Sequence, residues 1–196
     1  MFILSPCAAG CGRTAITGSQ LCAVHAASRE KEAERIARYI SERTVIKDLN
    51  APGLHFSSVD FSHRQFYGCN FKGAAFSMCL FTESFMRMVF FDFANFDNCD
   101  FSSSDLQFLS FAGANIRDCT FEGSEMLHLN YGGAVIRDCT FNKSNLYNSR
   151  FINADMEFSD FVDCNIKKVY FVQAKQEGIS FKSSNTAEAV FTLGEE

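Results

Sequence analysis

The sequence lacks the features that would carry the chain into or across a membrane. Its apolar runs all fall well short of the ~20 residues that span a bilayer. The apolar start at residues 2–4 is short and has no basic residue before it, so neither a signal peptide nor a lipoprotein site at Cys7 is expected. Without an export route, the nine cysteines do not indicate a secreted disulfide scaffold. We therefore expect a cytoplasmic protein with reduced thiols.

The usual signatures of catalysis are also missing. The chain has four histidines, and those beyond residue 50 have no Cys or Ser partner that would form a nucleophile and its base. Among them, His128 is expected to form a solvated pair with Glu125. A Gly-rich phosphate loop is absent, and Gly132-Gly133 is typical of a turn. These absences argue against an enzyme.

Tryptophan is absent and proline occurs only twice, yet the chain contains 23 phenylalanines. Every fifth residue from Phe56 to Phe191 belongs to one row, in which 26 of 28 positions are Phe, Leu, Met, Ile or Tyr and only Gln176 and Thr186 interrupt the pattern. A second row, two residues earlier in each pentad, is small or aliphatic apart from Arg64. A period of five fits neither a helix nor an extended strand, so the repeating unit must be a short segment followed by a turn.

The second row cycles through Ala, Cys, Ser and then Val or Leu, and this cycle takes 20 residues. Accordingly, ANIRDCTF at 114–121 recurs as AVIRDCTF at 134–141. Twenty residues should therefore make one circuit, with residues 20 apart in adjacent coils about 4.8 Å from each other and joined by strand-like hydrogen bonds. The large side chains would then stack in columns and fill a narrow shaft without voids. One such column contains Phe81, Phe101, Phe121, Phe141, Phe161 and Phe181.

Residues 54–193 resemble pentapeptide repeat proteins, whose pattern is a small residue, a polar residue, Leu or Phe, and two variable residues. The pentads CTFEG at 119–123 and ANFDN at 94–98 carry this pattern. The resemblance implies an all-β solenoid, which in this family is a right-handed quadrilateral β-helix, here of about seven coils. It says little about function, because the family serves many roles.

Six cysteines occupy the inward second row, at positions 69, 79, 99, 119, 139 and 164. Stacked thiols at coil spacing could bind metal or oxidise. Serines fill the equivalent place one side further on, however, so we interpret these cysteines as small buried apolar side chains.

The other three cysteines lie in one N-terminal segment, where Cys7, Cys11, Cys22 and His25 follow a C-x3-C, ten-residue, C-x2-H spacing. Four soft ligands with this spacing suit a tetrahedral structural zinc ion that has no open position. The segment resembles small treble-clef-like fingers, in which a Cys knuckle with a following Arg precedes Gly, Leu, Cys and His. The alternative is three incidental thiols and a surface histidine. A segment this short has little core, so metal binding would supply its folding energy.

Residues 21–46 are predicted to be helical, because they are rich in Ala, contain no Gly or Pro and place Glu34 and Arg38 at i and i+4. The sequence NAPG at 50–53 then predicts a stop. We therefore divide the chain into a zinc-binding finger at 1–25, a helix and linker at 26–53, and the β-helix at 54–196. An open solenoid end exposes backbone and apolar rings, so the finger and helix are expected to cap it.

Outward positions are mostly polar, but one cluster is apolar and is here called the partner surface: Phe85, Met88, Phe90, Phe93, Phe108, Leu127 and Tyr147. An aromatic cluster of this size is abnormal for a lone surface. Either the N-terminal helix covers it, or another protein does, or the chain bulges locally near Phe85. At the C-terminal end no capping helix follows the last coil, so Phe191 and Leu193 predict a homodimer joined through the final coils.

Some pentapeptide repeat proteins are DNA mimics that bind topoisomerases such as gyrase, and this is the alternative function. Residues 54–196 hold 18 acidic and 11 basic side chains, a net charge of −7. No column is acidic in every coil, however, and Arg117 and Arg137 are expected to neutralise Asp118 and Asp138. Direct nucleic-acid binding is not expected either, since the helix alternates Glu with Lys and Arg and the pI is near 5.4. The sequence favours a non-catalytic module that binds another protein.

Overall fold

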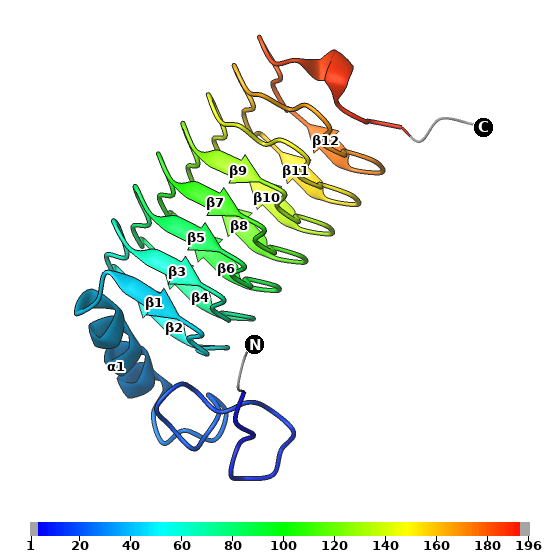
Figure 1. The fold of residues 1–196 in the computed structure, drawn as a ribbon. Coiled ribbons are helices and arrows are strands. Elements are labelled where there is room, and N and C mark those ends of the chain that lie inside the picture. The colour runs from blue at the N-terminus through cyan, green and yellow to red at the C-terminus, as the bar shows by residue number, and fades with distance from the viewer. Residues whose placement is uncertain (1–3, 193–196) are drawn as a thin grey trace.

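The structure, a computed structural model, describes residues 4–192 as a rod of stacked coils with a finger and a helix at its N-terminal end (Figure 1). The rod is a parallel β-solenoid of about seven coils, which confirms the predicted fold class. One sheet contains β1 (Val45–Lys47), β3 (Gln65–Tyr67), β5 (Phe85–Arg87), β7 (Asp105–Gln107) and β9 (Glu125–Leu127). The other contains β2 (His55–Ser57), β4 (Ala75–Ser77), β6 (Asn95–Asp97), β8 (Asn115–Arg117), β10 (Val135–Arg137), β11 (Asp155–Glu157) and β12 (Lys175–Glu177).

The chain pairs along four sides of the rod. The sheet that begins with β1 forms side A, and the sheet that begins with β2 forms side C, half a circuit further along the chain. Sides B and D lie between them and pair through isolated bridges, such as Asn70 with Phe90 on side B and Asp60 with Leu80 on side D. Pairing partners are 20 positions apart on every side. This register confirms the predicted length of the circuit.

The predicted phenylalanine columns lie buried in the centre of the rod. The ring of Phe121 stacks on Phe101 and on Phe141, with both centroid distances at 4.9 Å and interplanar angles of 8° and 2°. In a second column, Tyr131 stacks on Phe111 at 4.9 Å. The two columns meet edge to face, with the Phe121 and Tyr131 centroids 6.4 Å apart at 88°. Displaced stacks and edge-to-face contacts are the arrangements that aromatic rings prefer.

Small residues of the second row point inward, and the hydroxyl groups of its serines form hydrogen bonds with the backbone. The buried Ser124 hydroxyl accepts from the Ser104 N–H at 3.1 Å and donates to the Phe101 carbonyl at 2.8 Å. The hydroxyl group therefore keeps two hydrogen bonds in the core and leaves no orphaned polar atom. The cysteines of this row are free and buried. Burial raises the pKa of the Cys69 thiol to about 12, which keeps it in the neutral form of a small apolar side chain.

The last residue of most pentads turns the corner of the coil with a left-handed backbone. Asn98 has a φ of 53°, Asp118 of 51° and Gly123 of 68°. Asn, Asp and Gly adopt this region at the lowest cost, because their side chains are short or absent. A bulky residue at the same corner carries a conformational cost that these residues avoid.

The helix is shorter than the sequence predicted. α1 spans Arg29–Ser41 rather than residues 21–46, because the Ser28 hydroxyl accepts the Lys31 N–H and fixes the helix start there. Its apolar edge, which includes Ile36 and Ile40, is buried in the same core cluster as the first coils. α1 therefore packs on the N-terminal end of the rod (Figure 1).

The ladder of coils begins earlier than predicted. β1 pairs in register with β3, so residues from Val45 onward belong to the coil lattice and not to a linker. Ile46, Leu49 and Ala51 are buried in the two inward rows. At the other end, a 3-10 helix, η1 (Thr186–Glu188), lies in the last coil. None of the helices in residues 4–192 has the length and apolarity needed to cross a membrane.

Replacing Tyr131 with phenylalanine is expected to stabilise the rod by about 1 kcal/mol. The Tyr131 hydroxyl is fully buried and has no hydrogen-bond partner within residues 4–192. Burial raises the pKa of this phenol well above its ordinary value, so the group stays neutral and unsatisfied. Phenylalanine keeps the stacking and removes the orphaned oxygen. Urea unfolding of both proteins measures the difference, and a less stable Tyr131→Phe variant would mean that a bound water satisfies the hydroxyl.

Candidate metal centre and outer aromatic surface

A tight hairpin brings the first two cysteines together. The Cys7 N–H donates to the Arg13 carbonyl at 2.9 Å and closes the hairpin. Between these residues, Gly10 and Gly12 take φ values of 68° and 73°, which glycine adopts at little cost. The chain therefore reverses within the C-x3-C knuckle and returns Cys11 toward Cys7.

A second turn presents Cys22 and His25 to the same point. The N–H groups of His25 and Ala26 donate to the Cys22 carbonyl at 3.0 and 2.9 Å. The Ala8 N–H donates to the Gln20 carbonyl at 2.9 Å and joins this turn to the hairpin. The C-x2-H spacing thus forms a single turn that faces the knuckle.

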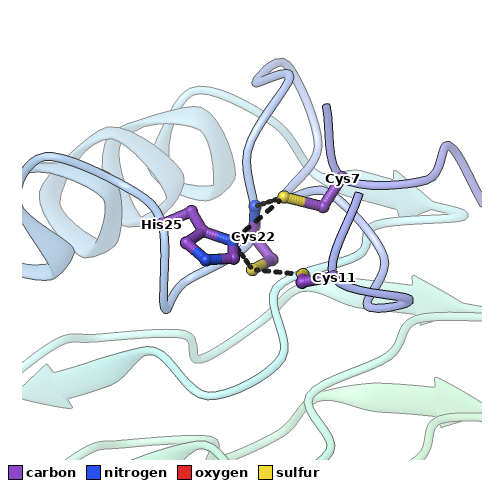
Figure 2. A group of neighbouring side chains, drawn as sticks. All are labelled: Cys7, Cys11, Cys22 and His25. Carbon is purple, nitrogen blue, oxygen red and sulfur yellow. Dashed lines mark hydrogen bonds between the residues drawn. The ribbon is translucent and has the colours of Figure 1, made fainter. Parts of the chain in front are cut away.

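The structure brings the four predicted ligands, Cys7, Cys11, Cys22 and His25, together with their ligand atoms within 4.8 Å of one another (Figure 2). The Sγ atoms of Cys11 and Cys22 are 3.8 Å apart. His25 Nδ1 lies 3.5 Å from Cys7 Sγ and 3.6 Å from Cys22 Sγ. Around a tetrahedral zinc ion, bonds of about 2.3 Å to sulfur and about 2.0 Å to nitrogen place sulfurs about 3.8 Å apart and sulfur and nitrogen about 3.5 Å apart. The donor set therefore fits a metal ion in a closed tetrahedral site.

The surroundings of the cluster favour the ligand form of its cysteines. Cys7 and Cys22 are buried, and the Cys22 N–H donates to Cys7 Sγ at 3.4 Å. A hydrogen bond from the backbone of Arg13 lowers the pKa of the Cys11 thiol to about 6. The thiolate is the form of cysteine that binds metal. Local hydrogen bonds therefore prepare the sulfurs for coordination.

A buried asparagine fastens the finger to the first coil. The Asn50 side-chain amide donates to Thr14 Oγ1 at 3.1 Å, and its backbone N–H donates to Thr17 Oγ1 at 2.7 Å. Its Oδ1 accepts from Asn70 Nδ2 at 2.7 Å. Arg35 of α1 donates to the Thr17 carbonyl at 2.6 Å. The finger, the helix and the first coil thus share one polar network. The sequence does not predict it, because NAPG at 50–53 indicates a linker and not a buried Asn50.

The partner surface lies on sides A and B, mainly in the third and fourth coils, and Leu127 and Tyr147 extend it along side A into the fifth and sixth coils. Four of its seven residues are exposed, with exposed fractions of 51% for Met88, 37% for Phe90, 59% for Phe93 and 46% for Phe108. The other three are half-buried: Phe85, Leu127 and Tyr147. The surface therefore presents bulky apolar side chains on two adjoining sides of the rod.

Two of the three explanations for this surface do not hold. α1 packs on the end of the rod and leaves Met88, Phe93 and Phe108 exposed in the part of the chain that the structure describes. Pairing along side A is regular at Phe85, which lies in register with Asp105, so the chain does not bulge there. Neither coverage by α1 nor a local bulge therefore accounts for the exposure of these side chains.

Aromatic rings continue from coil to coil along side A. Phe108 stacks on His128 with centroids 4.9 Å apart and an interplanar angle of 5°. His128 meets Tyr147 edge to face at 5.9 Å. Arg87 lies over Phe108 and Lys168 over Tyr147, each 5.5 Å from the ring centroid. On this side, each ring of the series Phe108, His128 and Tyr147 therefore packs against its neighbour, and a cation lies over the ring at each end.

Some outer residues differ from the sequence predictions. The expected pair of His128 with Glu125 is wrong, because His128 Nδ1 lies 2.8 Å from Asn148 Nδ2 and the imidazole stacks on its neighbours. Sequence reasoning also missed exposed apolar residues that stand apart from the cluster on sides C and D: Met78, Leu80, Val135 and Phe158. Their isolation gave no pattern to detect.

Arg137 forms part of a mixed-charge cluster on side C, with partners other than those predicted. It lies in register with Arg117, as expected. Its guanidinium pairs with Asp155 at 2.8 Å and Glu157 at 3.0 Å, one coil later, rather than with Asp138. The hydrogen bond from Arg137 lowers the pKa of the Asp155 carboxyl. Acidic charge on this side is therefore locally balanced.

The C-terminal end of the shaft is formed by the last coil. Phe191 is half-buried there and stacks on Phe171 with a centroid distance of 5.2 Å. Gln176 occupies a core position in β12 and is exposed. Leu193, the other predicted dimer residue, lies outside the described residues.

Comparison with known proteins relates the coils to a repeat family. Residues 91–123 and 132–167 match pentapeptide repeats in eight copies. A trypsin-treated variant of QnrB1, a plasmid-mediated fluoroquinolone resistance protein, shares 20% identity, with 71% of this chain and 73% of that chain covered and a TM-score of 0.53. HetL, a pentapeptide repeat protein involved in heterocyst differentiation regulation in the cyanobacterium Nostoc, shares 11% identity over 81% of this chain and 95% of its own, with a TM-score of 0.44. A comparison with curated proteins gives no match. With so few identical residues, the likeness to QnrB1 shows the fold alone.

Proposed function

Because the coils of this chain belong to the pentapeptide repeat family, we propose that the protein is a non-catalytic rod that binds another protein through its partner surface. The finger and α1 cap the N-terminal end of the rod in this proposal. Function in such a rod depends on the side chains that it presents and not on the fold itself.

The corner residues of the partner surface carry the proposal. Met88, Phe93 and Phe108 have φ values of 54°, 58° and 57°. A left-handed backbone costs a bulky residue about 1–3 kcal/mol, which Gly, Asn or Asp at the same corner would largely avoid. About half of each side chain is also exposed to water. Bulky apolar residues that are kept in costly, exposed positions favour a binding role.

Local packing accounts for part of this residue choice. The Phe93 ring covers Gly113 in the next coil, where an added Cβ would lie 2.7 Å from the ring. Phe158 covers Gly178 in the same way on side C, with a φ of 48° and an exposed fraction of 60%. Phe158 therefore matches Phe93 in backbone conformation and packing but stands apart from the partner surface.

The charge pattern argues against extending the proposal to DNA mimicry and topoisomerase binding. Duplex DNA carries one negative charge per ~1.7 Å of its axis. Side C instead pairs Asp155 and Glu157 with Arg137, and the rod carries a net charge of only −7 over residues 54–196. A surface that resembles DNA would need a longer unbroken run of carboxylates.

A structural zinc ion in the finger is part of the proposal. The distances among Cys7, Cys11, Cys22 and His25 support a closed tetrahedral site, which is typical of structural rather than catalytic zinc. The cysteines are all free, which supports a reducing compartment such as the cytoplasm.

We further propose a homodimer joined through the C-terminal coils. β12 is the last strand of side C, so one of its edges is unpaired within residues 4–192, and an open solenoid end invites pairing with its own copy. Light scattering at micromolar concentration is expected to give twice the chain mass of 21.9 kDa. A monomeric mass would count against the dimer.

The double variant Phe93→Asn/Phe108→Asn is expected to lose the partner. Asparagine suits the left-handed corner, so the variant should fold while its apolar contact area falls. Quantitative mass spectrometry of proteins captured from the source cells should show at least one specific partner reduced more than tenfold.

The matched control is Phe158→Asn, which makes the same change over the same kind of glycine. It should retain the partner and should change thermal stability by about as much as Phe93→Asn alone. Equal loss of the partner from both variants would mean that stability, and not the partner surface, governs capture.

A further inference from the structure

We propose that a groove between the finger, the start of α1 and the first coils binds an acidic, partly apolar peptide segment of the protein partner. This inference rests on the proposed function, because it gives that partner a second point of contact. The groove would bind carboxylate groups of the partner, whereas the partner surface would contact its apolar side chains.

The groove is a pocket of about 440 Å³ at the junction of three segments that lie far apart in the sequence. Arg13 belongs to the finger, and Arg29 is the first residue of α1. Lys72 follows side B of the second coil. Ala23, Val24 and Pro52 supply apolar wall between these cations. The lining contains no acidic side chain. Cationic groups over an apolar floor suit a ligand that has both carboxylates and an aliphatic side chain.

In the part of the chain that the structure describes, the cations of this groove form no close ion pair with a carboxylate, although Glu30 follows Arg29 in α1 and Asp92 lines the second hollow together with Lys72. Arg29 donates through Nε to the Ala23 carbonyl at 2.8 Å, which holds the guanidinium at the groove. The Lys72 ammonium lies 5.3 Å from the centroid of the Phe93 ring. Within residues 4–192, Arg13, Arg29 and Lys72 form no ion pair with a carboxylate. Several other cations of the rod do have such partners.

The groove continues onto side B and toward the partner surface. A second hollow of about 300 Å³ shares Asn70 and Lys72 with the first and adds Leu4, Phe90 and Asp92. Because Asp92 would repel a carboxylate, the carboxylates of the peptide would lie in the first hollow and its apolar residues in the second. Lys72 thus stands between the two hollows and beside Phe93. An extended peptide that follows both would reach the partner surface, which a small isolated anion would not.

Charge decides between a peptide and a nucleic acid. A single-stranded nucleic acid carries a charge at every nucleotide and would extend beyond three cations onto a rod with a net charge of −7. A peptide places its carboxylates only where the cations lie. Exposed ion pairs each contribute about 0.2–1 kcal/mol, so removal of one cation should weaken binding about 1.4- to fivefold.

The test uses the full zinc-loaded chain, labelled with 15N and titrated with synthetic peptides at up to millimolar concentration. The acidic probe is Ac-LDELDEL-NH2, and the neutral probe is Ac-LNQLNQL-NH2. The acidic peptide is expected to shift the amide resonances around Arg13, Val24, Arg29 and Lys72, and the neutral peptide is expected to shift them at least tenfold less. Added salt should weaken the acidic peptide only.

Variants locate the effect. Arg29→Glu/Lys72→Glu should weaken binding more than tenfold, and the milder Lys72→Gln should weaken it about 1.4- to fivefold. Arg117→Glu/Lys182→Glu makes the same charge change on distant coils and should leave binding intact. Absence of shifts at the groove, equal binding of the neutral peptide, or tighter binding of a 12-nucleotide oligothymidine would overturn the proposal. The acidic peptide could fail to bind the groove while Phe93→Asn/Phe108→Asn still reduces partner capture. That result would overturn the proposal for the groove and leave the proposed function standing.

Discussion

Replacing Cys22 with serine is expected to reduce zinc in the purified protein from about one ion per chain to less than a tenth of that. Cys22 Sγ forms one corner of the tetrahedron, and it lies 3.8 Å from Cys11 Sγ and 3.6 Å from His25 Nδ1. Serine lacks the soft thiolate that zinc prefers and leaves only three of the four ligands. Elemental analysis by mass spectrometry, after dialysis against a weak chelator, measures the ratio.

The same substitution should loosen the finger but leave the rod folded. The finger has few buried apolar residues of its own, whereas the rod has its own aromatic core. Zinc binding in small fingers supplies about 10–16 kcal/mol of apparent folding energy at neutral pH. Hydrogen exchange is therefore expected to rise in residues 5–25 of Cys22→Ser and to stay low in the coils.

The chain offers a matched control for this experiment in Cys164. This cysteine is buried in the same inward column as Ser124 and Ser144, where a serine hydroxyl finds both hydrogen bonds. Cys164→Ser should therefore keep one zinc ion per chain and nearly unchanged stability. A wild-type protein that binds no zinc, or a Cys164→Ser variant that loses it, would contradict the assignment of the four ligands.

Replacing Phe121 with alanine is expected to destabilise the rod by about 3–5 kcal/mol. The Phe121 ring is fully buried between Phe101 and Phe141 and contacts Tyr131 with its edge. The solenoid cannot collapse around the missing ring, because backbone pairing on four sides fixes the spacing of the coils. The cavity should therefore remain and add to the loss of apolar burial.

Urea unfolding monitored by circular dichroism measures this effect. Phe158→Ala removes the same ring from an exposed corner and should cost about 1 kcal/mol or less. Similar destabilisation by the two variants would mean that the central stack contributes no more than the surface. A change in oligomeric state would be checked in parallel, because dimer formation adds to apparent stability.

The coil lattice was predictable because each inward position leaves only two choices. In the first row, a ring or a long aliphatic chain fills the centre of the rod. In the second row, a small or aliphatic residue packs beside it. The period of five is therefore visible wherever Phe121 and its counterparts recur. The first coil escaped detection because it has Ala51 at the place where the later coils have phenylalanine or tyrosine. The sequence predicts too long a helix because alanine is abundant before Ser28, although that serine caps the helix.

The metal ligands were predictable from spacing, but their surroundings were not. A C-x3-C knuckle and a C-x2-H turn each form locally, so Cys7, Cys11, Cys22 and His25 could be selected from sequence. Asn50, by contrast, joins the coil to a finger that lies far away in the sequence. The groove cations also come from segments that only folding brings together. Contacts of this kind leave no local pattern.

The fixed length of the circuit has a consequence for how such a molecule can change over time. Insertion or loss of one whole circuit would lengthen or shorten the rod by a single coil and return every later side chain to its original side. Insertion of one pentad would preserve the core yet turn every later side chain by a quarter circuit. Length can therefore vary freely only in whole circuits, whereas quarter steps would change which surfaces point in the same direction.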